Sequence, residues 1–163
     1  MTEQRMDYST DKATRYAELA VEVASVVAGE TSRTARYATT ISLLVSAFGE
    51  RFFWCGFYEV DPLKPNELVV GPYQGTLGCL RIAFGKGVCG ACAASRKTII
   101  VPDVHKFPGH IACDSRSNSE IVVPVFDGEK LVAVLDVDST KFAAFDDADA
   151  KGLEAICRAM LKG

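Results

Sequence analysis

The feature that most restricts the fold is a hairpin signal in the C-terminal third of the chain. Two apolar segments, 121–126 and 130–138, are separated by Asp127-Gly128. This dipeptide between two strand-like segments is typical of a tight β-hairpin. The hairpin places a well-buried antiparallel sheet at the centre of the fold, and the other segments have to cover it.

Helical segments flank the predicted sheet. Apolar residues spaced at i, i+3 and i+4 predict amphipathic helices over 11–28 and 32–48, which Gly29 and Gly49 end, and a last helix from about 146 to 161. Between them, the sequence predicts strands and one short helix (88–95); the strands cover 52–60, 67–74, 79–84 and 98–101. This order predicts an α+β fold, with a mainly antiparallel central sheet flanked by helices.

The 163 residues suit one domain. We expect it to span 1–163, with two N-terminal helices over about 11–48, a sheet core over about 52–140 and the C-terminal helix over about 146–161. A net charge of −3 with interspersed signs argues against nucleic acid. No apolar run reaches the roughly 18 residues of a membrane span, and residues 1–7 lack a signal-peptide core. We therefore expect a cytoplasmic protein without membrane contact.

Six cysteines are unusual in a cytoplasmic chain, and four of them lie between positions 79 and 113. Cys89-Gly90-Ala91-Cys92 forms a CxxC motif at a helix start, where the helix dipole should lower the pKa of Cys89. Residue chemistry alone therefore favours Cys89 as a nucleophile. It leaves open a general thiol oxidoreductase that uses Cys89 and Cys92 and would reduce insulin-type disulfides.

The same cysteines also match a zinc-finger spacing with His105 and His110. Prolines and a glycine interrupt the helix that should carry both histidines, so we expect no metal site here.

Acidic side chains gather at the end of the hairpin. Alternation places Asp136 and Asp138 on one face of an otherwise apolar strand, where unpaired burial would be costly. Either the strand end is exposed to water or a cation, such as an ammonium group, meets the pair. A two-residue loop pairs Glu120 with Leu135, on the opposite face, whereas a bulge or a longer loop would bring Glu120 beside the aspartates.

Two further features allow both a structural and a functional interpretation. On the strand 52–60, Trp54 and Tyr58 flank Gly56 on one face, which predicts a hollow between two rings. These rings fill a core or line a pocket for an apolar or cationic ligand. The polar segment 109–120 carries Cys113, a histidine, an arginine and carboxylates, and is either a surface connection or a site.

Several motifs in order resemble one known family. They are Gly71-Pro72-Tyr73-Gln74-Gly75, Gly85-Lys86-Gly87-Val88-Cys89-Gly90, Asp103-Val104-His105, Gly109-His110-Ile111-Ala112-Cys113-Asp114, Ser117-Asn118-Ser119-Glu120 and Asp136-Val137-Asp138-Ser139. Together they are similar to the free methionine-(R)-sulfoxide reductases, which have a GAF-type fold. The resemblance is dense over about 52–160 and compatible over the N-terminal helices.

The resemblance implies a redox cycle without a cofactor or a metal. Cys113 would attack the sulfoxide sulfur, and Glu120 or an aspartate beside it would protonate the oxygen. Methionine leaves, and Cys113 becomes a sulfenic acid. Cys79, or else Cys89, would then form an intramolecular disulfide, which thioredoxin or a similar dithiol reopens. Cys92 is not a usual cysteine of this family.

The resemblance also implies how the substrate is held. Glu120, Asp136 and Asp138 would bind the ammonium of free methionine sulfoxide, and Trp54 and Tyr58 would form the wall for its methylthio group. A methionine within a chain lacks that ammonium, so the protein-bound form should not be reduced. A homodimer is left open. The alternative is a non-enzymatic GAF module that binds a ligand or senses redox state.

Overall fold

One antiparallel sheet with helices on both faces makes up the fold. The computed structural model describes residues 11–111 and 113–162. In this part of the chain, six strands follow the order β3-β2-β1-β6-β5-β4. The strands are β1 (Trp54–Asp61), β2 (Lys64–Gln74), β3 (Arg81–Ala83), β4 (Ile99–Val101), β5 (Ser119–Asp127) and β6 (Lys130–Ser139). The prediction of no signal peptide concerns residues 1–7, which lie outside the described residues. Ala112, in the segment 109–120, also lies outside them.

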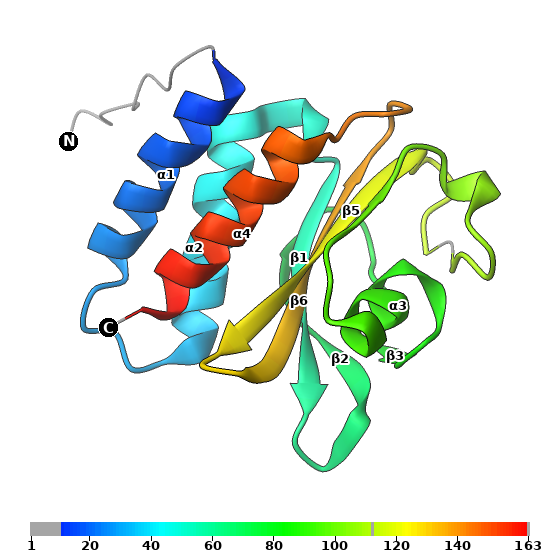
Figure 1. The fold of residues 1–163 in the computed structure, drawn as a ribbon, viewed down its shortest axis with the longest axis horizontal. Helices are drawn as coiled ribbons and strands as arrows, with labels where there is room; N and C mark the ends of the chain where they lie inside the picture. Colours follow the sequence, from blue (N-terminus) through cyan, green and yellow to red (C-terminus); the bar gives the residue numbers. More distant parts are fainter. Residues whose placement is uncertain (1–10, 112, 163) are drawn as a thin grey trace.

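Three long helices lie on one side of the sheet and a short one on the other (Figure 1). The helices are α1 (Lys12–Val26), α2 (Arg33–Phe48), α3 (Gly87–Ser95) and α4 (Asp147–Leu161), with 3-10 turns η1 (Gly49–Arg51) and η2 (Val104–Lys106). α1, α2 and α4 form the first group, and α3 stands alone. The α+β prediction is thereby confirmed.

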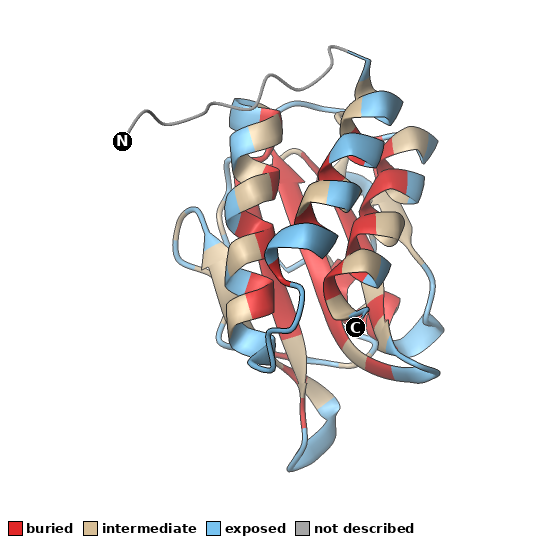
Figure 2. Cartoon of the chain, turned by 90° about the vertical axis from the view of Figure 1, so that its left-hand side faces the viewer, coloured by how far each residue is buried: buried red, intermediate tan, exposed pale blue. Residues whose placement is uncertain are grey.

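Strand alternation divides the interior into two cores. Cys55 and Phe57 of β1 pack under α1, α2 and α4, whereas Trp54 and Tyr58 of the same strand pack on the α3 side. Figure 2 shows the outer faces of the long helices exposed and the strands behind them buried. Cys157 of α4 is buried in the first core, as its place in the helix stripe predicts.

The helix ends follow their sequence signals closely. Asp11 and Ser32 accept hydrogen bonds from main-chain amides at the starts of α1 and α2, and Gly49 ends α2 with a positive φ of 58°. Asp146 and Asp149 form a capping box at α4. The segment 104–120, for which the sequence predicts no helix or strand, holds η2 and the first two residues of β5.

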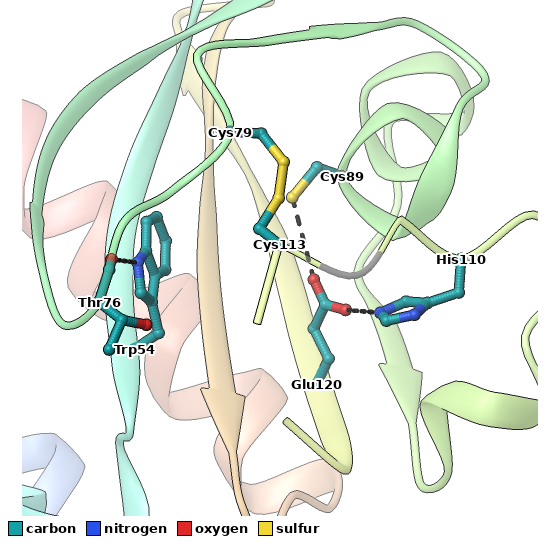
Figure 3. The surroundings of a disulfide bond; sticks show 7 residues. All are labelled: Trp54, Thr76, Cys79, Cys89, His110, Cys113 and Glu120. Atoms are coloured by element: carbon teal, nitrogen blue, oxygen red, sulfur yellow. Dashed lines mark hydrogen bonds and ion pairs between the residues drawn. A yellow bond between two sulfur atoms is a disulfide. The ribbon is translucent and has the colours of Figure 1, made fainter. Parts of the chain in front are cut away.

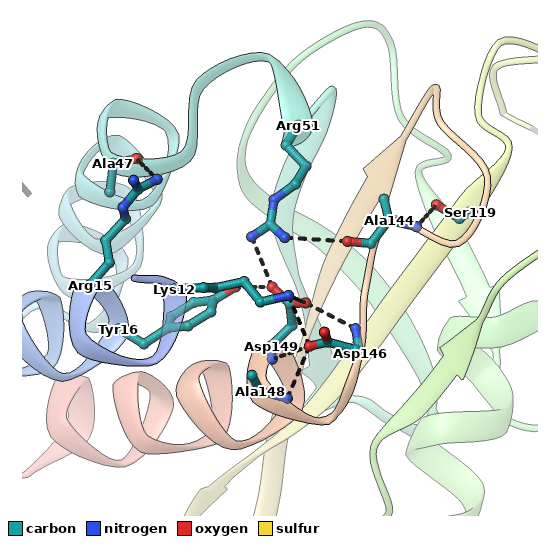
Figure 4. A network of polar contacts seen from close by, with 10 residues as sticks. All are labelled: Lys12, Arg15, Tyr16, Ala47, Arg51, Ser119, Ala144, Asp146, Ala148 and Asp149. Atoms are coloured by element: carbon teal, nitrogen blue, oxygen red, sulfur yellow. Dashed lines mark hydrogen bonds and ion pairs between the residues drawn. The ribbon is translucent and has the colours of Figure 1, made fainter. Parts of the chain in front are cut away.

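A buried carboxylate joins the two ends of the chain. Asp149 accepts hydrogen bonds from the Tyr16 hydroxyl at 2.7 Å and pairs with Lys12 and Arg51, both at 2.8 Å (Figure 4). Arg51 also donates to the carbonyl of Ala144. These contacts fix α1 and η1 on the first turn of α4.

Within the hairpin, a β-bulge sets the register. The turn residues are Gly128 and Glu129, one position later than the sequence suggests, because Asp127 pairs with Lys130. The pairing then shifts by one residue between Val125 and Phe126 on β5. Without this shift, Glu120 would lie opposite Val137; with it, Glu120 lies opposite Asp138. The bulge therefore turns Glu120 to the α3 side of the sheet.

Candidate active site

Three central strands present the acidic side chains to one pocket. Glu120 on β5 lies opposite Asp138 on β6, and Asp138 lies opposite Trp54 on β1. Asp136 is two residues before Asp138 and faces the same way. The sequence left open whether Glu120 joins the two aspartates, and the structure brings all three to one face.

The three acids are almost fully buried, and burial raises the pKa of each. The pKa of Glu120 rises to about 8, with the Asp138 carboxylate as a further cause. The pKa values of Asp136 and Asp138 also rise well above the usual range, because each has another carboxylate beside it. Asp136 Oδ1 has no hydrogen-bond partner in the described part of the chain. A cation or a hydrogen-bond donor in the pocket would offset the cost of burying these three acids.

Cys89 lies against this cluster and is not an activated thiol. It occupies the first turn of α3, as expected, and its Sγ is 4.0 Å from Glu120 Oε1. Burial raises the pKa of Cys89 well above its ordinary value, and the carboxylates of Asp136 and Glu120 raise it further. The prediction that the pKa of Cys89 is lowered at the helix start is wrong, because burial, with the acidic neighbours as a further cause, raises it.

A disulfide joins two loops at the mouth of the pocket. Cys79 precedes β3, Cys113 lies between η2 and β5, and the bond between them spans a Cα–Cα distance of 5.9 Å (Figure 3). Cys113 is exposed and Cys79 is half-buried. Cys55, Cys89, Cys92 and Cys157 are free and buried. The CxxC motif therefore holds two free thiols, and the two bonded cysteines are 34 positions apart.

The aromatic wall is more compact than alternation suggests. The ring of Trp54 lies over Gly56 and stacks on Tyr58, with centroids 5.7 Å apart and planes 19° apart. The hollow expected at Gly56 is therefore filled by the indole. A Cβ at Gly56 would lie 2.7 Å from that ring, so only glycine allows this stacking. The indole nitrogen donates to the carbonyl of Thr76 at 2.9 Å, which fixes the ring at the pocket wall.

His110 is a pocket residue to which the sequence gave no role of its own, although it lies in the polar segment 109–120. Its Nε2 is 3.6 Å from Glu120 Oε2, and burial lowers its pKa. Lys86 and Ser117 also line this cavity of about 50 Å³. Their position in the segments next to Cys89 and Cys113 was the available signal, but it gave no direction for the side chains.

One group of three buried side chains in the described part of the chain could hold a metal ion. Ligand atoms of Cys89, Glu120 and Asp136 lie within 4.8 Å of one another. The zinc-finger set does not converge: His105 is exposed and pairs with Asp103, whereas Cys92 is buried with its Sγ 3.7 Å from the carbonyl of Val122.

Comparison with known proteins shows the family to which the chain belongs. The GAF domain family matches residues 30–160. The free methionine-R-sulfoxide reductase of Escherichia coli is 43% identical over 146 residues, which cover 90% of this chain and 86% of that protein. The chain belongs to the free methionine-(R)-sulfoxide reductase family. GAF domain-containing protein A of Dictyostelium discoideum is 46% identical, with 90% of both chains covered.

Solved structures of this family superpose closely. The free methionine-R-sulfoxide reductase of Neisseria meningitidis, solved in complex with its substrate, has a TM-score of 0.89 and 46% identity over 95% of this chain and 92% of that one. The Staphylococcus aureus family member, also in complex with substrate, has a TM-score of 0.82 and 41% identity over 90% of this chain and 93% of that one.

Among the described residues, none of the helices has the length and apolar content needed to cross a bilayer.

Proposed function

We propose that this chain reduces free methionine-(R)-sulfoxide to methionine by a thiol cycle. One observation carries the proposal: the Cys79–Cys113 disulfide lies at the mouth of a pocket lined by three buried acids. Family membership supports the same activity. A non-enzymatic GAF module would need neither the disulfide nor the acids. The cycle suits the reducing cytoplasm, where thioredoxin or a similar dithiol is available.

The first half of the cycle takes place at Cys113. Its thiolate attacks the sulfoxide sulfur and forms an S–S bond as the sulfoxide oxygen takes up a proton. That S–S bond and the S–O bond then break as the hydroxyl group moves to Cys113, which becomes a sulfenic acid. Glu120, whose pKa of about 8 keeps it protonated at neutral pH, supplies the proton that the sulfoxide oxygen needs. Methionine, which is two electrons more reduced than the sulfoxide, then leaves the pocket.

In the second half, Cys79 closes the cycle. Its thiol attacks the Cys113 sulfenic acid, water leaves, and the disulfide forms. Cys89 is a less suitable resolving thiol because it is buried and its pKa is raised by the acids. A dithiol reductant then returns both cysteines to thiols.

The acid cluster gives a reason for a free amino acid as substrate. Asp136 Oδ1 has no hydrogen-bond partner among the described residues, and an α-ammonium would supply both a hydrogen bond and a positive charge. Asp138 and Glu120 complete the acidic side of the pocket, and the Trp54–Tyr58 stack forms an apolar wall for the methylthio group. A residue inside a peptide has no such ammonium.

A single-turnover assay without reductant tests the proposal. The reduced protein should release about one equivalent of methionine from the free R epimer and almost none from the N-acetylated R epimer. Cys113→Ser should release none. Cys79→Ser should still release methionine but leave a sulfenic acid that a dimedone probe labels. Cys89→Ser, the matched control, should behave as the native chain does.

Other outcomes would contradict specific parts of the scheme. Release by Cys113→Ser and not by Cys89→Ser would make Cys89 the nucleophile. Equal turnover of the free and acetylated substrates would remove the role of the acids in binding ammonium. Reduction of insulin-type disulfides without any sulfoxide would favour a general thiol oxidoreductase.

A further inference from the structure

The disulfide lies within a group of exposed apolar side chains. Seven large hydrophobic residues in the described part of the chain are exposed: Val21, Val26, Leu63, Leu77, Leu80, Ile111 and Phe142. Three of them, Leu77, Leu80 and Ile111, are within two positions of Cys79 or Cys113. Leu77 is 80% exposed and Leu80 is 73% exposed. We call these three residues the apolar rim.

Substrate binding accounts for only part of the rim. Leu77 and Ile111 line the pocket together with Cys113, so both can contact a small substrate at its mouth. Leu80 does not line the pocket, yet it follows Cys79 directly and faces water. A leucine exposed beside a reactive disulfide leaves apolar surface in contact with water, which is unfavourable. Exposed apolar residues that gather in this way mark protein contacts.

The proposed redox cycle needs such a contact. We propose that the apolar rim is the docking surface for a protein dithiol whose reactive cysteine is itself surrounded by apolar residues. This inference rests on the proposed function. Cys113 is exposed and Cys79 is half-buried, so an incoming thiolate can reach the bond between them.

The exchange is balanced between the two proteins. A thiolate of the partner attacks one sulfur of the Cys79–Cys113 bond, forms a mixed disulfide and releases the other cysteine as a thiolate. The second partner thiolate then attacks the mixed disulfide, releases the remaining cysteine and oxidises the partner. Two protons from solvent complete the two thiols of this chain.

Two arginines next to the rim are already paired within the chain, which favours an apolar contact over one steered by these charges. Arg81, which follows Leu80, pairs with Asp61 at 2.7 Å and with Glu67 at 3.0 Å. Arg116 pairs with Asp114 at 2.7 Å, and this ion pair is close to Cys113 in the chain.

Turnover with two reductants tests the docking surface. Leu80→Ser should raise the KM for thioredoxin about fivefold and leave dithiothreitol-driven turnover unchanged, because a small dithiol needs no docking surface. Leu63→Ser is the matched control: Leu63 is 89% exposed but lies at the tip of the β1–β2 hairpin, away from the disulfide. It should change neither reaction.

The failures of the two proposals can be told apart. Absence of dithiothreitol-driven turnover in the native chain would overturn the reductase activity itself. Turnover with dithiothreitol but not with thioredoxin, or equal thioredoxin kinetics for Leu80→Ser and Leu63→Ser, would overturn the docking surface alone. A change in oligomeric mass in Leu80→Ser with unchanged thioredoxin kinetics would assign the leucine to self-association and would also overturn it.

Discussion

At the residue scale, the proton on Glu120 decides the chemistry that its pocket can support. An ordinary glutamate is ionised at neutral pH and cannot donate a proton to a sulfoxide oxygen. Burial and the Asp138 carboxylate raise the pKa of Glu120 to about 8, so the acid form prevails at neutral pH. The Cys113 thiolate, by contrast, becomes more abundant as the pH rises. The two groups therefore predict a bell-shaped pH profile.

We expect the alkaline limb of that profile to report Glu120. As the pH rises through about 8, the proton is lost and kcat/KM for the free sulfoxide should fall. Glu120→Gln should lower kcat/KM about 100-fold and remove this limb. Initial rates from pH 6 to 10 with dithiothreitol as reductant would measure both effects. An alkaline limb that is unchanged in the Gln variant would belong to the substrate amine or to another group, and would contradict this role.

Cys89 shows why local sequence misjudges a thiol. The helix start at residues 86–89 was predictable, and so was its dipole. The opposing carboxylates come from β5 and β6, more than thirty positions later, and their distance to Cys89 depends on the packing of α3 on the sheet. A pKa set by such non-local groups cannot be obtained from the neighbouring residues alone.

At the element scale, the sequence could not show whether the hairpin contains a bulge. The alternation of Val, Ala and Leu in β6 is apolar on both faces, so a shift of one residue leaves hydrophobic burial almost unchanged. Only the polar residues at the end of the hairpin away from the turn distinguish the two registers. The structure has the register that places Glu120 beside Asp136 and Asp138, so the candidate site depends on the β-bulge.

Gly56 gives a prediction for strand β1. A Cβ there would approach the Trp54 ring to 2.7 Å and Tyr73 Cβ to 2.3 Å, so Gly56→Ala should force the indole away from Tyr58. We expect a loss of about 1–3 kcal/mol in the free energy of unfolding and a higher KM for the sulfoxide. Trp54 is the single tryptophan of the chain, so its fluorescence reports the displacement directly.

Gly49→Ala serves as the control for Gly56→Ala. Its φ of 58° strains an alanine, but no atom lies within 4 Å of an added Cβ. It should cost about 1 kcal/mol of stability and leave the tryptophan emission unchanged. Unchanged emission in Gly56→Ala would show that the strand absorbs the methyl group by moving its backbone.

At the scale of the whole molecule, the class of fold was predictable and the neighbours in the sheet were not. Periodicity identified each helix and the hairpin, because amphipathic segments carry their own signal. The pairing of β1 with β6, and of β4 with β5, joins strands far apart in the chain. Such contacts follow from the packing of the complete core, which no single segment encodes. The Cys79–Cys113 contact has the same origin, since two loops meet only once β2, β3 and β5 are in place.

The buried Asp149 network tests how the two chain ends stabilise the fold. Its side chain is fully buried and holds Tyr16, Lys12 and Arg51. Asp149→Ala should lower the free energy of unfolding by about 3–5 kcal/mol, since it leaves the Tyr16 hydroxyl buried without this partner and removes the carboxylate that pairs with Arg51 and Lys12. Urea unfolding of the reduced protein would measure the loss.

Asp127→Ala is the matched control for that measurement, because Asp127 pairs with Arg33 at the same 2.8 Å but both side chains are largely exposed. It should cost only about 0–1 kcal/mol. Arg51 also binds the Ala144 carbonyl, and the Ala144 amide donates to Ser119, which precedes Glu120. We therefore expect Asp149→Ala to raise the KM for the sulfoxide as well as to destabilise the fold. A loss as small as that of Asp127→Ala would show that solvent replaces the carboxylate, and that α1 is held to α4 by apolar packing alone.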